Sequence, residues 1–127
     1  MTAHSEAQGP LAGLKVLEMG QLIAGPFAAK TLGDFGAEVI KIEPPGAANP
    51  LRQCRLPQDG TPVWWPVQSR NKRPIALDLR HREAPAIVRR LAAASAVPIE
   101  NLRPRPPAGP GPASAALHLA NPRPLPP

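Results

Sequence analysis

The sequence predicts an α/β fold built on an open parallel sheet, and three observations lead to this prediction. A strand, a short helix and a second strand follow one another within residues 13–43. A third strand with alternating apolar residues lies within residues 71–80. An amphipathic helix and one more apolar strand come after it. A strand–helix–strand unit of this length implies parallel strands joined by a right-handed crossover.

The first unit is defined by glycines and by β-branched residues. Residues 13–20 are expected to form a strand, with a glycine at each end. Gly25 and Pro26 then open a helix, because proline is tolerated in the first helical turn. Gly36 stands where a left-handed cap ends such a helix. Residues 37–43, rich in valine and isoleucine, form the second strand.

The middle of the chain carries weaker signals. Residues 44–61 are expected to be a long loop, since prolines, glycines and polar residues dominate there. Residues 62–69 could form a short strand or an irregular segment, because Pro66 interrupts the pattern. Residues 71–80 form a strand in which apolar side chains alternate with Ala76 and Asp78.

The last elements repeat the helix-then-strand order. Residues 81–96 are expected to form an amphipathic helix with an apolar stripe and arginines on the opposite side. Pro85 requires that this helix begin close to it. Residues 96–101 read as another buried strand, which Pro98 weakens. These elements together give an open α/β sheet that ends early.

The composition changes sharply toward the C-terminus. Half of the 20 prolines lie from Pro98 onward, and few large apolar residues accompany them. A segment rich in Pro, Arg, Ala and Gly cannot offset its ordering entropy by apolar burial. We therefore expect a flexible N-terminus over residues 1–9. Over residues 103–127 we expect a tail that is disordered or translated out of frame, because these residue types have GC-rich codons.

The formal net charge of +6 raises the question of a nucleic-acid partner. Seven of the fifteen basic residues lie between Arg70 and Arg90. The sequence has no zinc-finger spacing and no tyrosine for base stacking, so we expect no nucleic-acid partner. The single cysteine, Cys54, allows no internal disulfide and suits a reducing compartment. With no apolar run of membrane-spanning length and no cysteine cluster for a metal, the expectation is a cytoplasmic protein without metal.

The turn between the first strand and the first helix raises the question of a phosphate site. Gly20 and Gly25 are five residues apart, so the G-x-G-x-x-G fingerprint of dinucleotide-binding folds is absent. Pro26 and Phe27 stand where the P-loop pattern requires lysine and serine or threonine. What remains is a helix N-terminus after a parallel strand, a place where open α/β folds gather ligands. A tight turn without any ligand role is the alternative.

Four sequence blocks, taken together, resemble a known family. They are the A-G-P turn within GQLIAGPF, the strand GAEVIKIE followed by P-P-G, the block NKRPIALDL, and IENLRP. In this order they resemble the N-terminal region of the family III CoA-transferases, which include formyl-CoA, carnitine-CoA and succinyl-CoA transferases. The resemblance covers about residues 10–104. It implies that residues 10–102 are part of a Rossmann-like large domain.

The resemblance also implies an activity. In this family CoA moves from an acyl-CoA thioester to a carboxylic acid, and an aspartate carboxylate attacks the thioester to form a mixed anhydride. The substrates implied are therefore coenzyme A or acyl-CoA and a carboxylic acid, without a metal. Full-length chains of the family interlock as a homodimer, which is not expected of so short a chain.

Site residues follow from the matching blocks. The turn that lies against CoA in the family corresponds to Leu22, Ile23, Ala24 and Gly25. The family's N-K-R block, near the CoA, corresponds to Asn71, Lys72 and Arg73. Lysine and arginine suit the CoA phosphates, although a solvated charge cluster is the alternative. Asn101 matches an asparagine near the adenine and pantetheine, whereas Leu102 and Arg105 depart from the family's pattern there.

The catalytic aspartate of the family has no counterpart in this sequence. Asp34, Asp59 and Asp78 are the only aspartates, and none matches the nucleophile's position, which lies farther downstream. The isolated chain is therefore expected to be inactive as a CoA-transferase. Two other functions stay open from the residues alone. One is a non-catalytic module that binds CoA or a nucleotide, and the other is a basic nucleic-acid-binding protein.

Overall fold

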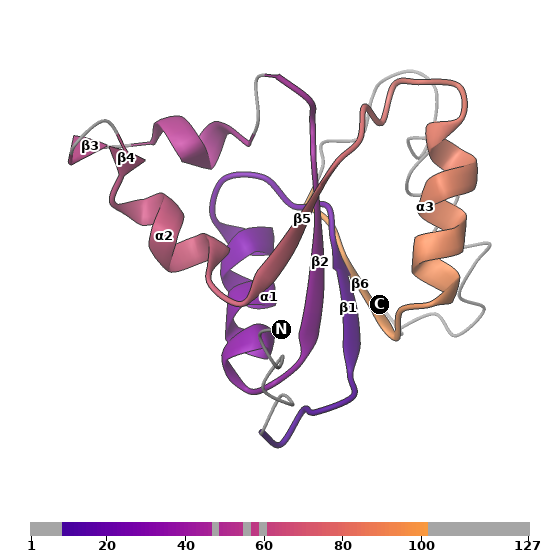
Figure 1. Ribbon diagram of the computed structural model, residues 1–127, viewed down its shortest axis with the longest axis horizontal. Coiled ribbons are helices and arrows are strands. Elements are labelled where there is room, and N and C mark those ends of the chain that lie inside the picture. The colour runs from indigo at the N-terminus through magenta and orange to yellow at the C-terminus, as the bar shows by residue number, and fades with distance from the viewer. Residues whose placement is uncertain (1–8, 47–48, 55–56, 59–60, 102–127) are drawn as a thin grey trace, which may run out of the picture.

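The computed structural model describes residues 9–46, 49–54, 57–58 and 61–101 of the chain. The main feature of these residues is a four-stranded parallel sheet with the order β5–β2–β1–β6 (Figure 1). Its strands are β1 (Lys15–Glu18), β2 (Glu38–Glu43), β5 (Lys72–Ala76) and β6 (Val97–Ile99). The predicted α/β class with an open parallel sheet is therefore confirmed.

Within the described residues, three α-helices cover the two faces of this sheet. Helix α1 (Ala24–Asp34) joins β1 to β2, α2 (Trp64–Ser69) precedes β5, and α3 (Ala84–Ala93) joins β5 to β6. In Figure 1, α1 and α2 lie on one face and α3 lies on the other. The chain moves outward from β1 to β5, then returns across the opposite face to place β6 beside β1. This reversal creates a switch point between the carboxyl ends of β1 and β6, where open α/β sheets bind ligands.

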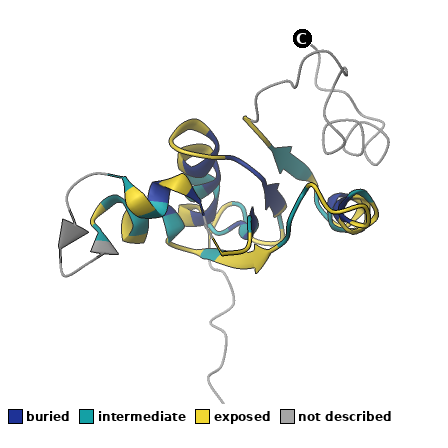
Figure 2. Cartoon of the chain, turned by 90° about the horizontal axis from the view of Figure 1, so that it is seen from above, coloured by how far each residue is buried: buried dark blue, intermediate teal, exposed yellow. Residues whose placement is uncertain are grey.

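Apolar side chains fill both faces of the sheet, following the two-residue period of the strands. The core beneath α3 contains the buried residues Leu17, Met19, Ile42, Val88 and Ala92. The core beneath α1 contains Val16, Ala29, Ala37 and Val39. Figure 2 shows the buried residues gathered on the strands and on the sides of the helices that face them. Complete burial of one such large side chain contributes about 1.5–3 kcal/mol.

The α1 face of the sheet changes character along the strands. Val16 and Val39 lie near its amino end, whereas Glu18, Lys41 and Glu43 occupy the same face toward the carboxyl end. All three charged side chains are buried. Along this face the side chains therefore change from apolar to charged. The charged end lies beneath the start of α1 and supports the turn that precedes the helix.

The structure corrects two expectations about the middle of the chain. Residues 62–69, expected to be a strand or irregular, contain α2, with Pro66 near its start, where proline is tolerated. The expected loop over residues 44–61 includes a 3-10 helix, η1 (Pro50–Gln53), and part of a small antiparallel pair. This pair consists of β3 (Pro57–Gln58) and β4 (Thr61–Pro62).

The expected ends of other elements are largely confirmed. Gly36 has a φ of +100° just after α1, as a left-handed cap requires. Strand β5 is shorter than predicted, but Leu77 and Leu79 still pack against the core beneath α3. Helix α3 begins beside Pro85, and β6 forms in spite of Pro98. The predictions for residues 1–9 and 103–127 fall outside the described residues, apart from Gly9.

A carboxylate at the C-terminal end of α1 ties this helix to the segment before β5. Asp34 forms an ion pair with Lys30 at 2.8 Å and accepts two hydrogen bonds from the Arg70 guanidinium. It also accepts a hydrogen bond from the Asn71 amide at 3.1 Å. The hydrogen bonds from Lys30 and then Arg70 lower the pKa of Asp34 below its ordinary value.

This carboxylate predicts a pH dependence of stability. We expect Asp34→Asn to lower the urea midpoint of unfolding at neutral pH, and the difference from wild type to disappear in acid. Because the folded-state pKa lies below that of the unfolded chain, the stabilisation is complete above the unfolded pKa. It is lost as the pH falls through the folded-state pKa. Urea titrations from neutral pH down to about pH 2 measure it.

The control for this prediction removes the cations first. In a Lys30→Ala/Arg70→Ala background, Asp34→Asn should have little effect at any pH, because the groups that lower the carboxyl pKa are absent. A difference between Asp34→Asn and wild type that persists unchanged into acid would contradict the assignment.

Candidate functional site

The turn between β1 and α1 is compact because two glycines touch. A Cβ atom added to Gly20 would lie 2.6 Å from the Cα of Gly25, and one added to Gly25 would lie 2.7 Å from the Cα of Gly20. Real side chains do not tolerate such distances, so both positions require glycine. The glycines thus have a packing role, and the turn lies at the carboxyl edge of the sheet beside the switch point.

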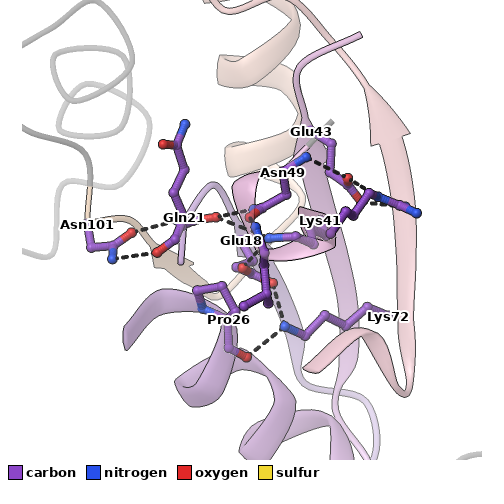
Figure 3. A network of polar contacts seen from close by, with 11 residues as sticks. Glu18, Gln21, Pro26, Lys41, Glu43, Asn49, Lys72 and Asn101 are labelled. Atoms are coloured by element: carbon purple, nitrogen blue, oxygen red, sulfur yellow. Dashed lines mark hydrogen bonds and ion pairs between the residues drawn. The ribbon is translucent and has the colours of Figure 1, made fainter. Parts of the chain in front are cut away.

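Asn101, just after β6, grips this turn across the switch point. Its Oδ1 accepts a hydrogen bond from the backbone N–H of Gln21 at 2.7 Å. Its Nδ2 donates to the carbonyl oxygen of the same residue at 2.9 Å. The amide of Asn101 therefore satisfies both backbone groups of Gln21, as Figure 3 shows.

The outer part of the turn carries exposed apolar side chains. Leu22 has a φ of +59°, in the left-handed region that a bulky residue rarely adopts. The exposed fractions of Leu22 and Ile23 are 49% and 58%, and that of Phe27 in the first turn of α1 is 54%. A strained residue next to an exposed apolar surface is typical of a ligand-binding turn.

A buried carboxylate lies directly beneath the turn. Glu18, at the end of β1, is fully buried and forms ion pairs with the Nζ atoms of Lys41 and Lys72, at 2.5 Å and 2.8 Å. The side chains of these lysines are 1% and 2% exposed. Buried charges of this kind persist only when they are paired, so the three side chains depend on one another.

The same lysines hold the backbone of the turn (Figure 3). Lys41 donates to the carbonyl oxygen of Gly20 at 3.1 Å, and the Asn49 side chain donates to this oxygen at the same distance. Lys72 donates to the carbonyl oxygen of Pro26 at 2.7 Å. Burial lowers the pKa of Lys72 below its ordinary value, and the hydrogen bond to Glu18 opposes this shift.

A second carboxylate organises the neighbouring edge. Glu43, at the end of β2, accepts two hydrogen bonds from the Arg52 guanidinium at 2.9 Å and 3.2 Å. The guanidinium also stacks 3.7 Å from the centre of the Trp65 ring. Glu43 accepts a further hydrogen bond from the backbone of Asn49 at 3.3 Å. Arg52, 39% exposed, is therefore held in one orientation with part of its surface open.

An open groove with a volume of about 350 Å³ lies at the carboxyl ends of β2 and β5. It is lined by Glu43, Pro44, Pro45, Gly46, Arg52, Pro74, Ile75 and Ala76. Most of this lining is apolar, and Arg52 supplies the cation. Beyond β5, Arg80 is 83% exposed and forks onto Asp78 at 3.1 Å, so it adds a second accessible guanidinium at this edge.

The structure brings together only part of the predicted site. Leu22, Ile23, Ala24 and Gly25 lie at the carboxyl edge, where Asn101 contacts them through Gln21 and Gly25. The three residues of the N-K-R block separate. Asn71, with a φ of +61°, is held by Asp34 at the amino edge of the sheet. Lys72 is buried, and Arg73 is 76% exposed and pairs with Glu38 at 2.7 Å.

Several residues of this site escaped the sequence prediction, namely Glu18, Lys41, Asn49 and Arg52. Lys41 and Glu43 did leave a signal, because they share a strand face with Val39, which the apolar pattern assigns to the core. A charge on the buried face of a strand is unusual and indicates a partner. The partners themselves, Glu18 and Arg52, come from other segments and depend on the strand order.

The aspartates of the chain do not form a catalytic cluster in the described residues. Asp34 and Asp78 are each paired with an arginine, and the hydrogen bond from Arg80 lowers the pKa of Asp78. Asp59 lies outside the described residues. Within the described ranges, no group of three or more His, Cys, Asp or Glu side chains is placed to hold a metal. Every helix in that part of the chain is too short or too polar to cross a lipid bilayer.

Comparison with known proteins relates the chain to one family. A family model described as CoA-transferase family III matches residues 11–123. The succinyl-CoA–D-citramalate CoA-transferase of Chloroflexus aurantiacus is 49% identical over 75% of this chain and 24% of its own length. The human succinyl-CoA:glutarate CoA-transferase is 42% identical over 75% of this chain and 22% of its own.

A solved structure extends the likeness to three dimensions. A CAIB/BAIF family protein from Brucella suis superposes with a TM-score of 0.66 at 38% identity, over 74% of this chain and 26% of the other. The chain thus spans about a quarter of the length of the proteins it matches. The family match also includes most of residues 103–127.

The glycine contact predicts opposite effects for two substitutions in α1. We expect Gly25→Ala to destabilise the chain by about 1–3 kcal/mol, because the added methyl group overlaps Gly20. Gly33→Ala is the matched control, since its methyl group would find only ordinary contacts at 3.4 Å to Asn71 and Val39. It should be neutral or stabilise by up to about 1 kcal/mol, because alanine favours helix. Urea unfolding compares the two, and equal effects would contradict the packing role.

The buried ion pairs predict a large effect at Glu18. Glu18→Gln leaves two buried ammonium groups without a carboxylate, so we expect a loss of about 3–5 kcal/mol in the free energy of unfolding. Adding Lys72→Met should restore part of this loss, because one unpaired ammonium group is removed. The control Asp78→Asn removes an exposed ion pair and should have little effect. A double variant less stable than Glu18→Gln alone would contradict this account.

Proposed function

The chain belongs to CoA-transferase family III, and from that premise we propose that it supplies a CoA-binding part of an enzyme that transfers CoA. The reaction proposed moves CoA from an acyl-CoA thioester to a carboxylic acid. The observation that carries this proposal is the shared edge of the sheet. The rigid turn around Gly20 and Gly25 and the groove beside Arg52 both lie at the carboxyl ends of the strands.

The groove suits the nucleotide end of CoA. Its apolar lining of prolines, Ile75 and Ala76 matches the flat face of an adenine ring. Arg52 lines the groove and Arg80 is exposed beyond the carboxyl end of β5, and a guanidinium pairs well with phosphate oxygens. We place the CoA phosphates on these two arginines. Lys72 serves the site indirectly, since its buried ammonium group holds Glu18 and Pro26.

The turn suits the other end of CoA. Leu22 and Ile23 expose apolar surface next to the switch point, and Ala24 is exposed at the start of α1, whereas Gly25 is buried against Gly20. We propose that this surface forms one wall for the pantetheine arm and the thioester. We place the nucleophilic aspartate of the reaction outside this chain, because none of Asp34, Asp59 and Asp78 matches the position of the family's nucleophile. Asp34 and Asp78 are also committed to arginine pairs.

The names of the relatives suggest the substrates. Both enzymes named above take succinyl-CoA as one substrate, and both D-citramalate and glutarate are dicarboxylic acids. We therefore propose succinyl-CoA as the donor and a dicarboxylate as the acceptor of the complete enzyme. The reaction conserves the thioester: the C–S bond of succinyl-CoA breaks and a C–S bond to the acceptor acyl carbon forms. In net terms one oxygen of the acceptor carboxylate passes to the succinyl group, which leaves as succinate.

Two further expectations stay proposals. A cytoplasmic location suits the single cysteine, Cys54, and the CoA chemistry. An out-of-frame origin of residues 103–127 has a direct test in the coding DNA. The family match through residue 123 favours a family-derived origin for at least part of this segment. A continuous in-frame reading supported by independent sequencing would end the out-of-frame hypothesis.

The proposed site predicts how CoA binding responds to arginine substitutions. We expect isothermal titration calorimetry to detect CoA binding by the 127-residue chain. Arg52→Ala and Arg80→Ala should each weaken it about tenfold or more, the effect of losing a charged hydrogen bond. Arg89→Ala, an exposed arginine on α3, is the matched control and should leave the affinity unchanged.

Two results would oppose the proposal. One is the absence of CoA binding by a folded chain, and the other is an equal loss of affinity in all three arginine variants. Transfer from succinyl-CoA to glutarate by the chain alone is not expected, since its described aspartates are paired. Turnover that depends on the acceptor acid would overturn the assignment of the nucleophile outside this chain.

A further inference from the structure

We propose that Asn101 is a positioning residue that latches the β1–α1 turn, and that it holds Leu22 in its strained conformation without contacting the ligand itself. The ligand part of this inference rests on the proposed function. The geometric part stands on the hydrogen bonds and backbone angles of the turn. Three observations support it: the hydrogen bonds of the Asn101 amide, its position against the two glycines, and the backbone strain at Leu22.

The first observation is how the Asn101 amide is used. Its oxygen accepts from the N–H of Gln21 and its nitrogen donates to the carbonyl of Gln21, at 2.7 Å and 2.9 Å. A side-chain amide thus satisfies the backbone N–H and C=O of Gln21, which would otherwise need other partners. Because both groups of the amide are engaged with one residue, the side chain is fixed in a single orientation.

The second observation is the place of this amide against the two glycines. The Oδ1 atom of Asn101 lies 3.1 Å and 3.2 Å from where a Cβ of Gly20 or Gly25 would be. The amide therefore occupies the space that the missing side chains leave. The two glycines serve the latch as well as each other, since a methyl group on either would press on Asn101.

The third observation is the strain that begins just beyond the latch. Gly20 is fixed from below by Lys41 and Asn49, and Gln21 is fixed from the side by Asn101. Leu22, the next residue, has a φ of +59°. A leucine persists in the left-handed region only where its surroundings determine it. The anchored residues before it supply that constraint, and α1 supplies it afterwards.

The function of the latch depends on the surface that the strained residue presents. Leu22 and Ile23 expose about half of their surface at the switch point, and the backbone angle of Leu22 sets their direction. Without the amide of Asn101, the backbone of Gln21 loses both partners and Leu22 can return to a relaxed conformation. The apolar wall would then turn away from the ligand although no residue of the wall has changed.

A double-mutant cycle between Asn101 and Leu22 tests the latch. Glycine adopts a positive φ without strain, so Leu22→Gly allows the turn to keep its shape without the amide. We expect Asn101→Ala to weaken CoA binding about tenfold when residue 22 is leucine. In the Leu22→Gly background the same substitution should weaken it by less than about threefold. Glu100→Ala, an exposed neighbour of Asn101, is the control for changes at this chain segment.

Nuclear magnetic resonance on the same proteins gives a readout without ligand. Asn101→Ala should speed amide hydrogen exchange at Gln21 about tenfold while exchange in α3 stays unchanged. It should also shift the Cα and Cβ resonances of Leu22 away from left-handed values. Asn101→Asp keeps the acceptor for the Gln21 N–H, so protection at Gln21 should largely remain. This variant also keeps the test valid if Asn101→Ala does not fold.

The outcomes separate the latch from a direct ligand contact. An equal loss of CoA affinity in both residue 22 backgrounds, with unchanged exchange at Gln21, would overturn the inference. Faster exchange at Gln21 and shifted Leu22 resonances, with the loss confined to the leucine background, would support it. If no variant binds CoA, the proposed function fails, and the exchange and resonance measurements still decide the role of Asn101.

Discussion

The carboxylate of Glu18, shared between two buried lysines, is the interaction on which the candidate site depends. It neutralises Lys41 and Lys72, which enter from two neighbouring strands. Lys41 donates to the carbonyl oxygen of Gly20 in the turn, and Lys72 donates to that of Pro26 in the first turn of α1. An unpaired ammonium group could not remain in this interior. The shape of the turn therefore depends on the ion pairs of Glu18 with Lys41 and Lys72 beneath it.

The sheet divides two tasks along a single face. At its amino end, valines and alanines beneath α1 supply apolar burial. At its carboxyl end, the same face of the sheet carries Glu18, Lys41 and Glu43. Buried ion pairs add little net stability, but here they fix the positions of the groups that they contact. Lys41 donates a hydrogen bond to the turn and Glu43 accepts hydrogen bonds from Arg52, so one polar row supports both the turn and the groove.

Local patterns in the sequence predicted most elements of the fold, but they missed the contacts that depend on strand order. The strands around Val16, Ile40 and Ile75, together with α1 and α3, carry clear periodicities and form as expected. The resemblance placed Lys72 near the CoA phosphates, and the alternative was a solvated charge cluster. Lys72 is buried because β5 pairs with β2 so that this residue opposes Val39 on the α1 face. Nothing in the local sequence fixes that register.

The Asn101 contact also bears on the order in which the contacts of the turn can form. Gln21 and its partner are separated by 80 positions, and the lysines that brace the turn enter between them. Contacts between distant residues close late, because the entropy of closing the loop must be offset first. The glycine turn is synthesised before Lys41, Lys72 and Asn101, the residues that later contact it or the start of α1. Asn101 can hold Gln21 only when β6 has joined β1, so the candidate site is complete only once the last described strand is in place.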